Sequence, residues 1–317
     1  MTQAVLGLDT SCYTTSCALV DTQGRILANA RRMLNVPAGE RGLRQSEALF
    51  AHVTRLPDLI EQAVAEAGRP QVIAICASDR PADGDDSYMP VFRAGASFAR
   101  SAAAVAGARC YTTTHQRGHL AAALLDNPGF PAEFLAVHLS GGTTQLLKIA
   151  QDRVEALGGT GDISAGQLLD RVGVALGMRF PAGAEMEGLA WDAAPTGRYP
   201  SATKGYSLHF SGAEAAAQRD AQAGALPQGQ IAAELFDVIA RSLAKILARA
   251  AEDTGIRDVL LCGGVASSSL LLERMRARAD RLHTSLRITR GKPALSSDNA
   301  VGVAVIGLRK LMEDGGA

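Results

Sequence analysis

The pattern that most constrains the fold is a block of three short apolar runs joined by tight polar turns, because this block occurs twice. The first copy covers residues 4–32 and the second covers residues 134–158. Runs of about five apolar residues separated by Gly and small polar residues are typical of consecutive antiparallel hairpins. The copies start about 130 residues apart, so the sequence predicts a duplicated domain.

Helical and strand patterns alternate after each block. The expected helices cover residues 47–67, 92–106, 116–125, 164–176 with Ser164 as N-cap, 231–253, 267–279 and 300–312. The expected strands cover residues 72–77, 110–112, 258–262 and 286–289. The first helix should bury one apolar side, made of Leu49, Phe50, Val53, Leu56, Leu59, Ile60 and Val64.

This alternation predicts an α/β protein of two lobes, each with a mixed sheet flanked by helices, and a ligand cleft between them. The N-terminal lobe should span residues 1–130, with the closing helix from about 300 to 317 packing back on it. The C-terminal lobe should span residues 131–299, with an insertion at about 181–228 that is rich in Gly, Ala and Pro.

Amino-acid composition limits which partners the chain can bind and indicates its cellular compartment. Lys plus Arg and Asp plus Glu number 32 each among 317 residues, so any tRNA contact would need a local patch or a partner protein. An exported or membrane-anchored protein is not expected, because the sequence has neither a signal-like start nor a long apolar run. Five scattered cysteines, Cys12, Cys17, Cys76, Cys110 and Cys262, indicate reduced thiols and a cytoplasmic location.

Each repeated block places a small polar turn between its first two runs, Asp9-Thr10-Ser11 in the first and Ser140-Gly141-Gly142-Thr143-Thr144 in the second. Such turns can direct successive backbone N–H groups and hydroxyls at a phosphate. One Gly-rich turn alone indicates little, but a matched pair favours phosphate binding.

Two further segments leave a ligand role and a purely structural role equally open. Gly263-Gly264 ends an apolar strand, where it either lets the backbone approach a flat ligand or simply turns the chain. Asp170 either accepts hydrogen bonds from a ribose or has a surface or capping role.

His115 and His119 stand at i and i+4 at the start of a helix, a spacing that places two imidazoles on one metal ion. A third ligand must come from elsewhere, and Asp298, just before the last helix, is the best carboxylate. The alternative is a solvated pair of histidines with Asp298 as an N-cap. His52 and His138 lie in apolar or amphipathic runs and are expected in the core.

With these residues placed, nearly the whole chain resembles the TsaD family, tRNA threonylcarbamoyladenosine enzymes of the actin-like ATPase (ASKHA, ribonuclease H-like) superfamily that were formerly labelled O-sialoglycoprotein endopeptidases or glycoproteases. The matching segments are Gly7 to Cys12, His115 to His119, Ser140-Gly141-Gly142 with Thr144-Gln145, Leu157 to Asp162, Gly166 to Asp170, Pro181-Ala182-Gly183, Phe210-Ser211-Gly212, Gly263-Gly264-Val265 and Asp298-Asn299.

The resemblance implies a site of known composition. His115, His119 and Asp298 would bind one iron or zinc ion. An adenine nucleotide would have its phosphate wrapped by His138, Leu139, Ser140, Gly141 and Gly142, its sugar contacted by Asp170 and Gly183, and its adenine by Gly263, Gly264 and Ser268. The implied activity is metal-dependent transfer of a threonylcarbamoyl group from its adenylate to a tRNA adenosine, without a side-chain nucleophile.

The chain departs from the family pattern around this ligand. Thr143, Ser268 and Glu214 replace the usual His, Asn and Lys. Tyr13 and Thr14 stand where acids are usual, and Gly84-Asp85-Asp86-Ser87-Tyr88 replaces a Gly-Pro-Gly-Leu segment. A divergent paralogue is therefore indicated, either with a related carbamoyl transfer or as a non-catalytic, nucleotide-binding partner that forms a heterodimer with a family enzyme. The older metalloendopeptidase label is a weaker alternative, because no Glu lies between His115 and His119.

Overall fold

The computed structural model describes the chain except for residues 12, 37–42, 85–86 and 316–317. Cys12, Asp85 and Asp86, which the sequence comparison singles out, therefore lie outside the described residues. The chain divides into two compact units. The first is built from Met1–Val36, Gly42–Pro128 and Asp298–Ala317, and the second mainly from Gly129–Ser297.

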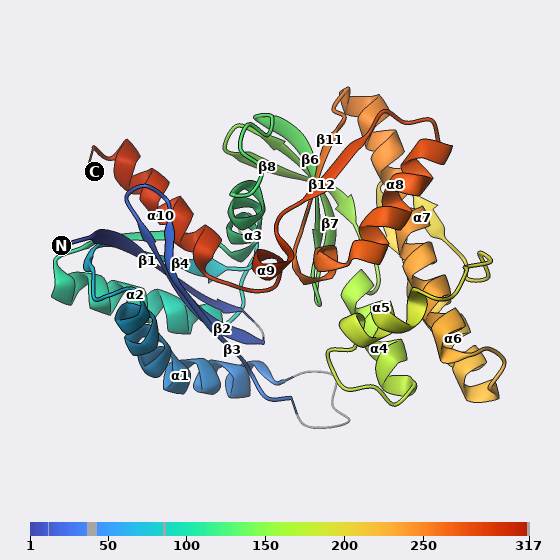
Figure 1. Cartoon of the computed structure of the whole chain (residues 1–317), viewed down its shortest axis with the longest axis horizontal. Helices are drawn as coiled ribbons and strands as arrows, with labels where there is room; N and C mark the ends of the chain where they lie inside the picture. Colours follow the sequence, from blue (N-terminus) through green and yellow to red (C-terminus); the bar gives the residue numbers. More distant parts are fainter. Residues whose placement is uncertain (12, 37–42, 85–86, 316–317) are drawn as a thin grey trace. The chain divides into compact units, whose positions relative to one another are not determined.

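The first unit contains a five-stranded sheet in the order β3-β2-β1-β4-β5. Its strands are β1 (Gln3–Ser11), β2 (Thr14–Asp21), β3 (Ile26–Met33), β4 (Gln71–Arg80) and β5 (Arg109–Thr114). The first three strands pair antiparallel, whereas β1, β4 and β5 run parallel. Its helices are α1 (Gln45–Glu66), α2 (Phe92–Ala106), α3 (His115–Leu124) and α10 (Val301–Glu313) (Figure 1).

Alternation along β1 separates two apolar layers, because successive side chains of a strand point to opposite faces. Leu6 and Leu8 pack in one cluster with residues of α1 and α2, whereas Val5 packs in another with residues of α10. Gly7 lies on the α10 face, where a Cβ atom would come 2.4 Å from the carbonyl oxygen of Ala300. The backbone of the closing helix therefore rests directly on the central strand.

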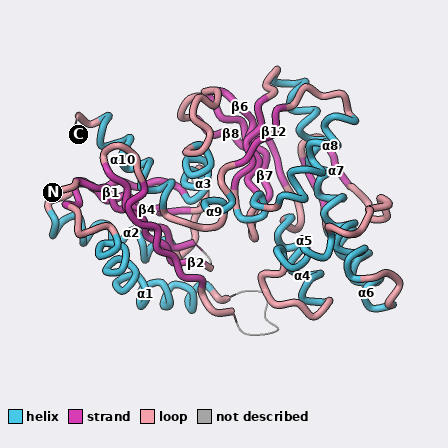
Figure 2. The backbone as a smooth tube through the Cα atoms, in the orientation of Figure 1, coloured by secondary structure: helices cyan, strands magenta, loops and turns pink. Residues whose placement is uncertain are grey.

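The second unit repeats this topology with its own sheet, in the order β12-β11-β6-β7-β8. Its strands are β6 (Glu133–Leu139), β7 (Thr144–Ala150), β8 (Arg153–Gly159), β11 (Asp258–Cys262) and β12 (Arg287–Arg290). Again three strands pair antiparallel and two join the sheet parallel to the first of them. The expected α/β fold with duplicated mixed sheets is confirmed (Figure 2).

The helices of the second unit include α4 (Ala165–Ala175), α5 (Gly183–Ala190), α6 (Ser211–Ala223), α7 (Gln228–Thr254), α8 (Ser269–Arg281) and the short α9 (Pro293–Ser296). The segment read as an insertion forms α5, α6 and a two-stranded hairpin, β9 (Ala202–Lys204) with β10 (Ser207–His209). The hairpin was not predicted, because runs of three residues carry too little alternation to be recognised.

Three local predictions are wrong. Phe50 and Val53 are exposed, although the apolar pattern assigned them to the buried side of α1. Asp9-Thr10-Ser11 is not a turn, since these residues are the last of β1. The helix after Gly263 does not begin at Ser267, because a 3₁₀ turn (Gly264–Ser267) precedes α8.

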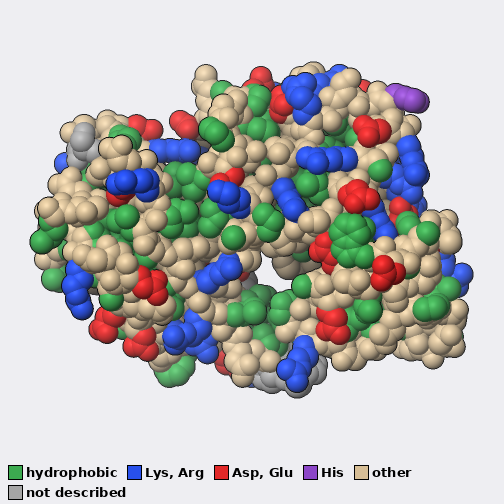
Figure 3. All heavy atoms as spheres, in the orientation of Figure 1, with side chains coloured by type: hydrophobic (Ala, Val, Ile, Leu, Met, Phe, Trp, Pro, Cys, Tyr) green, Lys and Arg blue, Asp and Glu red, His purple; other side chains and the backbone are tan. Residues whose placement is uncertain are grey.

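Charged side chains of both signs are interspersed on the face shown in Figure 3. None of the described helices is long and apolar enough to span a bilayer. Cys17, Cys76 and Cys262 are buried free thiols and Cys110 is an exposed one. Burial raises the pKa of the three buried thiols to about 12.

Candidate metal centre and ligand-binding residues

The first turn of α3 presents two imidazoles from one helix face. Thr114 is the N-cap, and its hydroxyl accepts a hydrogen bond from the backbone N–H of Arg117 at 3.2 Å, which fixes the start of the helix. His115 and His119, one turn apart, then meet edge to face with ring centroids 4.5 Å apart. Their Nε2 atoms are 3.1 Å from each other.

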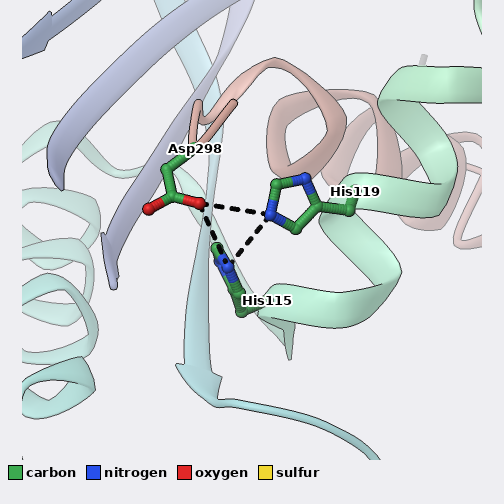
Figure 4. Close-up of side chains that lie close together, drawn as sticks. All are labelled: His115, His119 and Asp298. Atoms are coloured by element: carbon green, nitrogen blue, oxygen red, sulfur yellow. Dashed lines mark hydrogen bonds and ion pairs between the residues drawn. The ribbon is translucent and has the colours of Figure 1, made fainter. Parts of the chain in front are cut away.

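Asp298 completes the cluster from the segment just before α10. Its Oδ1 atom lies 3.3 Å from Nε2 of His119 and 3.6 Å from Nε2 of His115 (Figure 4). All three residues belong to the first unit, so the fold brings together ligands that are far apart in the sequence.

The alternative interpretation of these residues is wrong. Asp298 is not an N-cap, because α10 begins after Ala300 without a side-chain cap and the N–H of Val301 donates to Asn299 at 3.0 Å. His119 is only 5% exposed, so the histidines are not a solvated pair.

The arrangement fits a small divalent cation. One donor atom from each residue lies within 4.8 Å of the other two. Ligands about 2.0–2.2 Å from a metal such as zinc are themselves about 3.0–3.5 Å apart at tetrahedral or octahedral angles, and the three observed separations are 3.1, 3.3 and 3.6 Å. Two imidazoles and one carboxylate are also a donor set that zinc and iron accept.

Two residues of β1 contact the outer sides of these ligands. Nδ1 of His115 lies 2.9 Å from Oδ1 of Asp9, and the hydroxyl of Ser11 donates to Oδ2 of Asp298 at 2.9 Å. The sequence predicted both β1 residues as part of a phosphate-binding turn. In the fold their side chains instead contact the histidine and the carboxylate, because Asp9 and Ser11 are alternate residues of β1 and point to the same face.

The charges of the cluster attract a cation. Burial lowers the pKa of His115, but the carboxylates of Asp9 and Asp298 outweigh burial and bring that pKa to about 9. Burial raises the pKa of Asp298, whereas the hydrogen bond from His119 and the charges of the two histidines hold it well below its ordinary value. Positive charge at this position is therefore stabilised.

The second candidate region is the turn between β6 and β7 in the second unit. The N–H of Ser140 donates to the carbonyl of Thr143 at 2.8 Å, and the N–H of Thr143 donates to the Ser140 hydroxyl at 3.1 Å. Gly141 and Gly142 are exposed, with open space where a Cβ atom would stand. The predicted phosphate-binding turn is thus a closed loop with an accessible tip.

This turn is fixed to the N-terminus of α4. Ser164 caps the helix through a capping box with Gln167, as predicted, and its hydroxyl also donates to the carbonyl of Gly141 at 2.7 Å. A Cβ atom on Gly166 would come 2.5 Å from the carbonyl oxygen of Ser140. A helix N-terminus favours negative charge, so the surroundings of the turn suit an anion.

Parallel pairing places Gly263 at the same sheet edge as the turn. Cys262 pairs with His138 in the register of β11 and β6, so both strands end together at an edge where α/β proteins commonly bind ligands. Gly263 has a φ angle of 96°, and a Cβ atom there would come 2.4 Å from the carbonyl oxygen of Leu139. This glycine is therefore required by backbone packing. A Cβ atom on Gly264 would meet only the Cα atom of Ser297, at 4.0 Å.

Asp170 and Gly183 are neighbours, as a shared ligand contact would require. Oδ1 of Asp170 accepts the N–H of Ala182 at 2.8 Å, and burial raises its pKa although the N–H groups of Ala182 and Gly183 oppose the rise.

Ser268 caps α8 by accepting the N–H of Leu271 at 3.0 Å. His138 is buried, as expected of a core residue.

A family model described as "tRNA N6-adenosine threonylcarbamoyltransferase" matches residues 28–305. The chain belongs to the TsaD family. This family comprises acyltransferases of tRNA processing, so the chain is assigned to that enzyme class.

Proteins of the same description from a bacterium and an archaeon are similar over almost the whole length. The protein of Thermus thermophilus is 33% identical over 96% of this chain and 92% of its own length. That of Methanopyrus kandleri is 31% identical over 96% of this chain and 86% of its own length. Similarity at this level extends through both units.

Solved structures share the fold at much lower identity. T. kodakarensis HypF has a TM-score of 0.66 at 15% identity and covers 99% of this chain and 48% of its own. A glucokinase of the ROK family from Streptomyces griseus has a TM-score of 0.54 at 16% identity and covers 96% of this chain and 99% of its own. These likenesses establish the actin-like fold predicted from the sequence.

Three departures from the family pattern have clear structural surroundings. Oε2 of Glu214 on α6 lies 3.4 Å from the Arg171 guanidinium, and Oε1 accepts from Gln218 at 3.0 Å. Ser268 is used as a helix cap. Tyr13 accepts the N–H of Leu34 through its carbonyl at 2.7 Å, a contact that does not depend on its side chain.

Proposed function

We propose that this protein transfers a threonylcarbamoyl group from threonylcarbamoyl-adenylate to the N6 amine of an adenosine in tRNA, using one iron or zinc ion. The observation that carries the proposal is the convergence of one donor atom from each of His115, His119 and Asp298 within the first unit. Membership of the TsaD family supports the acyl group and the acceptor.

The adenylate is assigned to residues of the second unit. Ser140, Gly141 and Gly142 hold the phosphate at the accessible turn, where the N-terminus of α4 stabilises its negative charge. Asp170 and Gly183 face the sugar. Gly263, Gly264 and Ser268 border the adenine, with His138 and Leu139 supporting the turn as the end of β6.

The reaction needs no side-chain nucleophile. The N6 amine attacks the carbamoyl carbonyl carbon, a C–N bond forms, and the C–O bond to the phosphate breaks, so that AMP leaves and the N6 proton passes to solvent. The metal ion supplies Lewis acidity toward the carbonyl. The turn at Ser140 stabilises the negative charge on the departing phosphate.

The chain carries no net charge, so its overall charge does not attract the tRNA phosphates. We assign contact with tRNA to a partner protein of the same superfamily or to a local basic patch. A cytoplasmic location is part of this proposal, and it is supported by the tRNA substrate of the family.

A second function is a non-catalytic role, in which the chain binds a nucleotide and pairs with a true family enzyme. The use of Ser268 as a helix cap and the pairing of Glu214 with Arg171 favour it, since both positions surround the ligand. A metalloendopeptidase role is weaker, because the residues between the two histidines are Gln116, Arg117 and Gly118 and offer no general base.

Complementation separates these functions. The unaltered chain, expressed in cells depleted of their own enzyme, is expected to restore threonylcarbamoyladenosine in hydrolysed tRNA, measured by mass spectrometry. His119→Ala should fail to restore it and should lose bound metal. His283→Asn is the control, because His283 is exposed and its φ of 52° suits Asn.

Each other outcome has a defined meaning. If the unaltered chain does not restore the nucleoside but still gains thermal stability with an adenine nucleotide, the partner function replaces the transferase. Equal metal content in His119→Ala and the unaltered protein would refute the proposed metal centre. If saturating ATP or ADP does not raise the melting temperature, the assigned adenylate residues are wrong.

A further inference from the structure

The end of β1 approaches the metal ligands with alternate side chains. Thr10 faces α2, where its hydroxyl donates to the carbonyl of Val91 at 2.9 Å and accepts the N–H of Gly95 at 3.2 Å. Asp9 and Ser11 point to the opposite face, the one on which α10 packs. Two side chains spaced by two residues are thereby aimed at the ligand cluster.

Asp9 determines which nitrogen of His115 can bind a metal. An ionised carboxylate only accepts hydrogen bonds, so Nδ1 of His115, 2.9 Å from Oδ1 of Asp9, must carry the proton. The lone pair of the neutral ring is then on Nε2, the atom that faces His119 and Asp298. The hydroxyl of Ser78 also donates to Oδ1 of Asp9 and holds the carboxylate in place.

Ser11 has the same effect on the carboxylate ligand. Its hydroxyl donates to Oδ2 of Asp298 at 2.9 Å. The other oxygen, Oδ1, is the one that lies 3.3 Å from His119 and 3.6 Å from His115. A carboxylate held this way offers a single oxygen to a cation.

The burial of Asp9 indicates that it balances charge. Its side chain is fully buried, and its Oδ2 atom accepts no hydrogen bond from any residue that the structure describes. A buried carboxylate is costly unless a positive charge compensates it. A divalent cation bound by two neutral imidazoles and Asp298 retains one positive charge, which Asp9 neutralises.

We propose that Asp9 and Ser11 are positioning residues of the metal centre: Asp9 fixes the tautomer of His115 and neutralises the site, and Ser11 orients Asp298. This inference rests on the proposed function for the presence of a metal ion. It adds two residues that act through the candidate ligands, which they contact.

The test measures metal affinity and metal spectra on the purified full-length protein. Metal-free samples of the unaltered protein, Asp9→Asn and Ser11→Ala are titrated with Zn²⁺ in competition with a chelator dye, and with Co²⁺ while the visible absorption is recorded. Outer partners of metal ligands typically contribute 10- to 100-fold in affinity. We expect a loss of about that size in Asp9→Asn, a loss of about 10-fold in Ser11→Ala, and altered Co²⁺ bands in both.

Thr10→Val is the matched control, because it removes a hydroxyl from the same strand on the opposite face. It should lower the urea midpoint of unfolding, because the carbonyl of Val91 and the N–H of Gly95 lose their hydroxyl partner, and leave the Zn²⁺ affinity and the Co²⁺ spectrum unchanged. Ser11→Thr, which keeps a hydroxyl, should recover the affinity lost in Ser11→Ala.

The two hypotheses fail differently. Tight Zn²⁺ binding by the unaltered protein with the same affinity and spectrum in Asp9→Asn and Ser11→Ala would overturn the positioning role alone. A loss of affinity in Thr10→Val equal to that in Ser11→Ala would also overturn it, because the effect would then come from the strand as a whole. If the unaltered protein does not retain Zn²⁺, the metal centre itself is wrong. Ser11→Ala still decides the matter if Asp9→Asn does not fold.

Discussion

A Cβ atom on Gly302 would lie 1.9 Å from the carbonyl oxygen of Gly118, so α10 and α3 touch backbone to backbone. Gly118 stands between the two histidines, and Gly302 is the second residue of α10, which begins shortly after Asp298. The contact of these two glycines therefore sets the separation between the imidazoles and the carboxylate. A side chain at Gly302 would push apart the two segments that carry the candidate ligands, whereas a Cβ atom on Gly118 would have its closest contact with a methyl group of Val303, at 3.0 Å.

Gly302→Ala should consequently weaken both the fold and the metal centre. We expect a loss of about 3 kcal/mol or more in urea unfolding, because the added methyl group cannot be accommodated without moving a helix. Bound metal should fall with it. Gly188→Ala is the control, since Gly188 lies in α5 with open space around it, and its stability should stay within about 1 kcal/mol. Similar behaviour of the two variants would contradict the close helix contact.

Gly263→Ala and Gly264→Ala should differ strongly although the residues are adjacent. The first combines a φ of 96° with a methyl group 2.4 Å from the Leu139 carbonyl, and should cost about 2–4 kcal/mol. The second meets its nearest atom at 4.0 Å and should cost less than about 1 kcal/mol. Urea unfolding followed by circular dichroism compares them, and equal costs would show that the backbone contact is not needed.

His52 should make stability depend on pH. It is buried, with Nδ1 2.8 Å from the hydroxyl of Thr15, and burial lowers its pKa to about 4. The unfolded histidine titrates near about 6.5, so below that pH the unfolded chain binds more protons than the folded one. Stability is therefore fully present above about pH 6.5 and falls as the pH drops toward 4, by up to about 1.4 kcal/mol per pH unit.

Measuring the free energy of unfolding of the parent and of His52→Gln at about pH 7 and about pH 5 isolates this effect. The difference between the two proteins should change in favour of the variant at the lower pH. His283→Asn, altered at an exposed site, should follow the parent. A pH-independent difference between parent and His52→Gln would mean that folding does not lower the pKa of His52.

Glu234 should anchor the segment that leads from α5 to the β9–β10 hairpin. The fully buried carboxylate accepts the N–H and hydroxyl of Thr196 at 2.6 and 2.8 Å, and the N–H groups of Gly197 and Arg198 at 3.0 and 2.9 Å. Glu234→Gln replaces an acceptor by a donor and should cost about 2–4 kcal/mol. The exposed Glu252→Gln on the same helix should change stability by less than about 0.5 kcal/mol. Equal effects in urea unfolding would refute the anchoring role.

Much of the fold could be predicted from the sequence, because strand and helix periodicities are strong where elements are long. The bounds of α2 match the expected residues 92–106, and the capping box at Ser164 follows from residue type and spacing. Phe50 and Val53 were misassigned because a 22-residue helix that is apolar over a wide arc does not reveal which part of the arc faces the sheet.

The ligand triad could also be predicted, although only the fold brings Asp298 to the histidines. The roles of Asp9 and Ser11 could not, because a polar stretch at the end of an apolar run has the composition of a turn. Whether such residues continue the strand depends on the neighbouring strands, β2 and β4, that hydrogen-bond to it. Similarly, the register between β11 and β6 determines that the packing at position 263 requires glycine. No local sequence pattern specifies that register.

The polypeptide leaves the first unit at Pro128 and re-enters it at Asp298. During synthesis, the histidines emerge from the ribosome long before Asp298, and the sheet of the first unit has no covering helix from α10 until the second unit has been translated. Premature termination anywhere between these two points would yield a product without the third ligand. A complete set of three candidate ligands thus requires that the whole second unit has been translated.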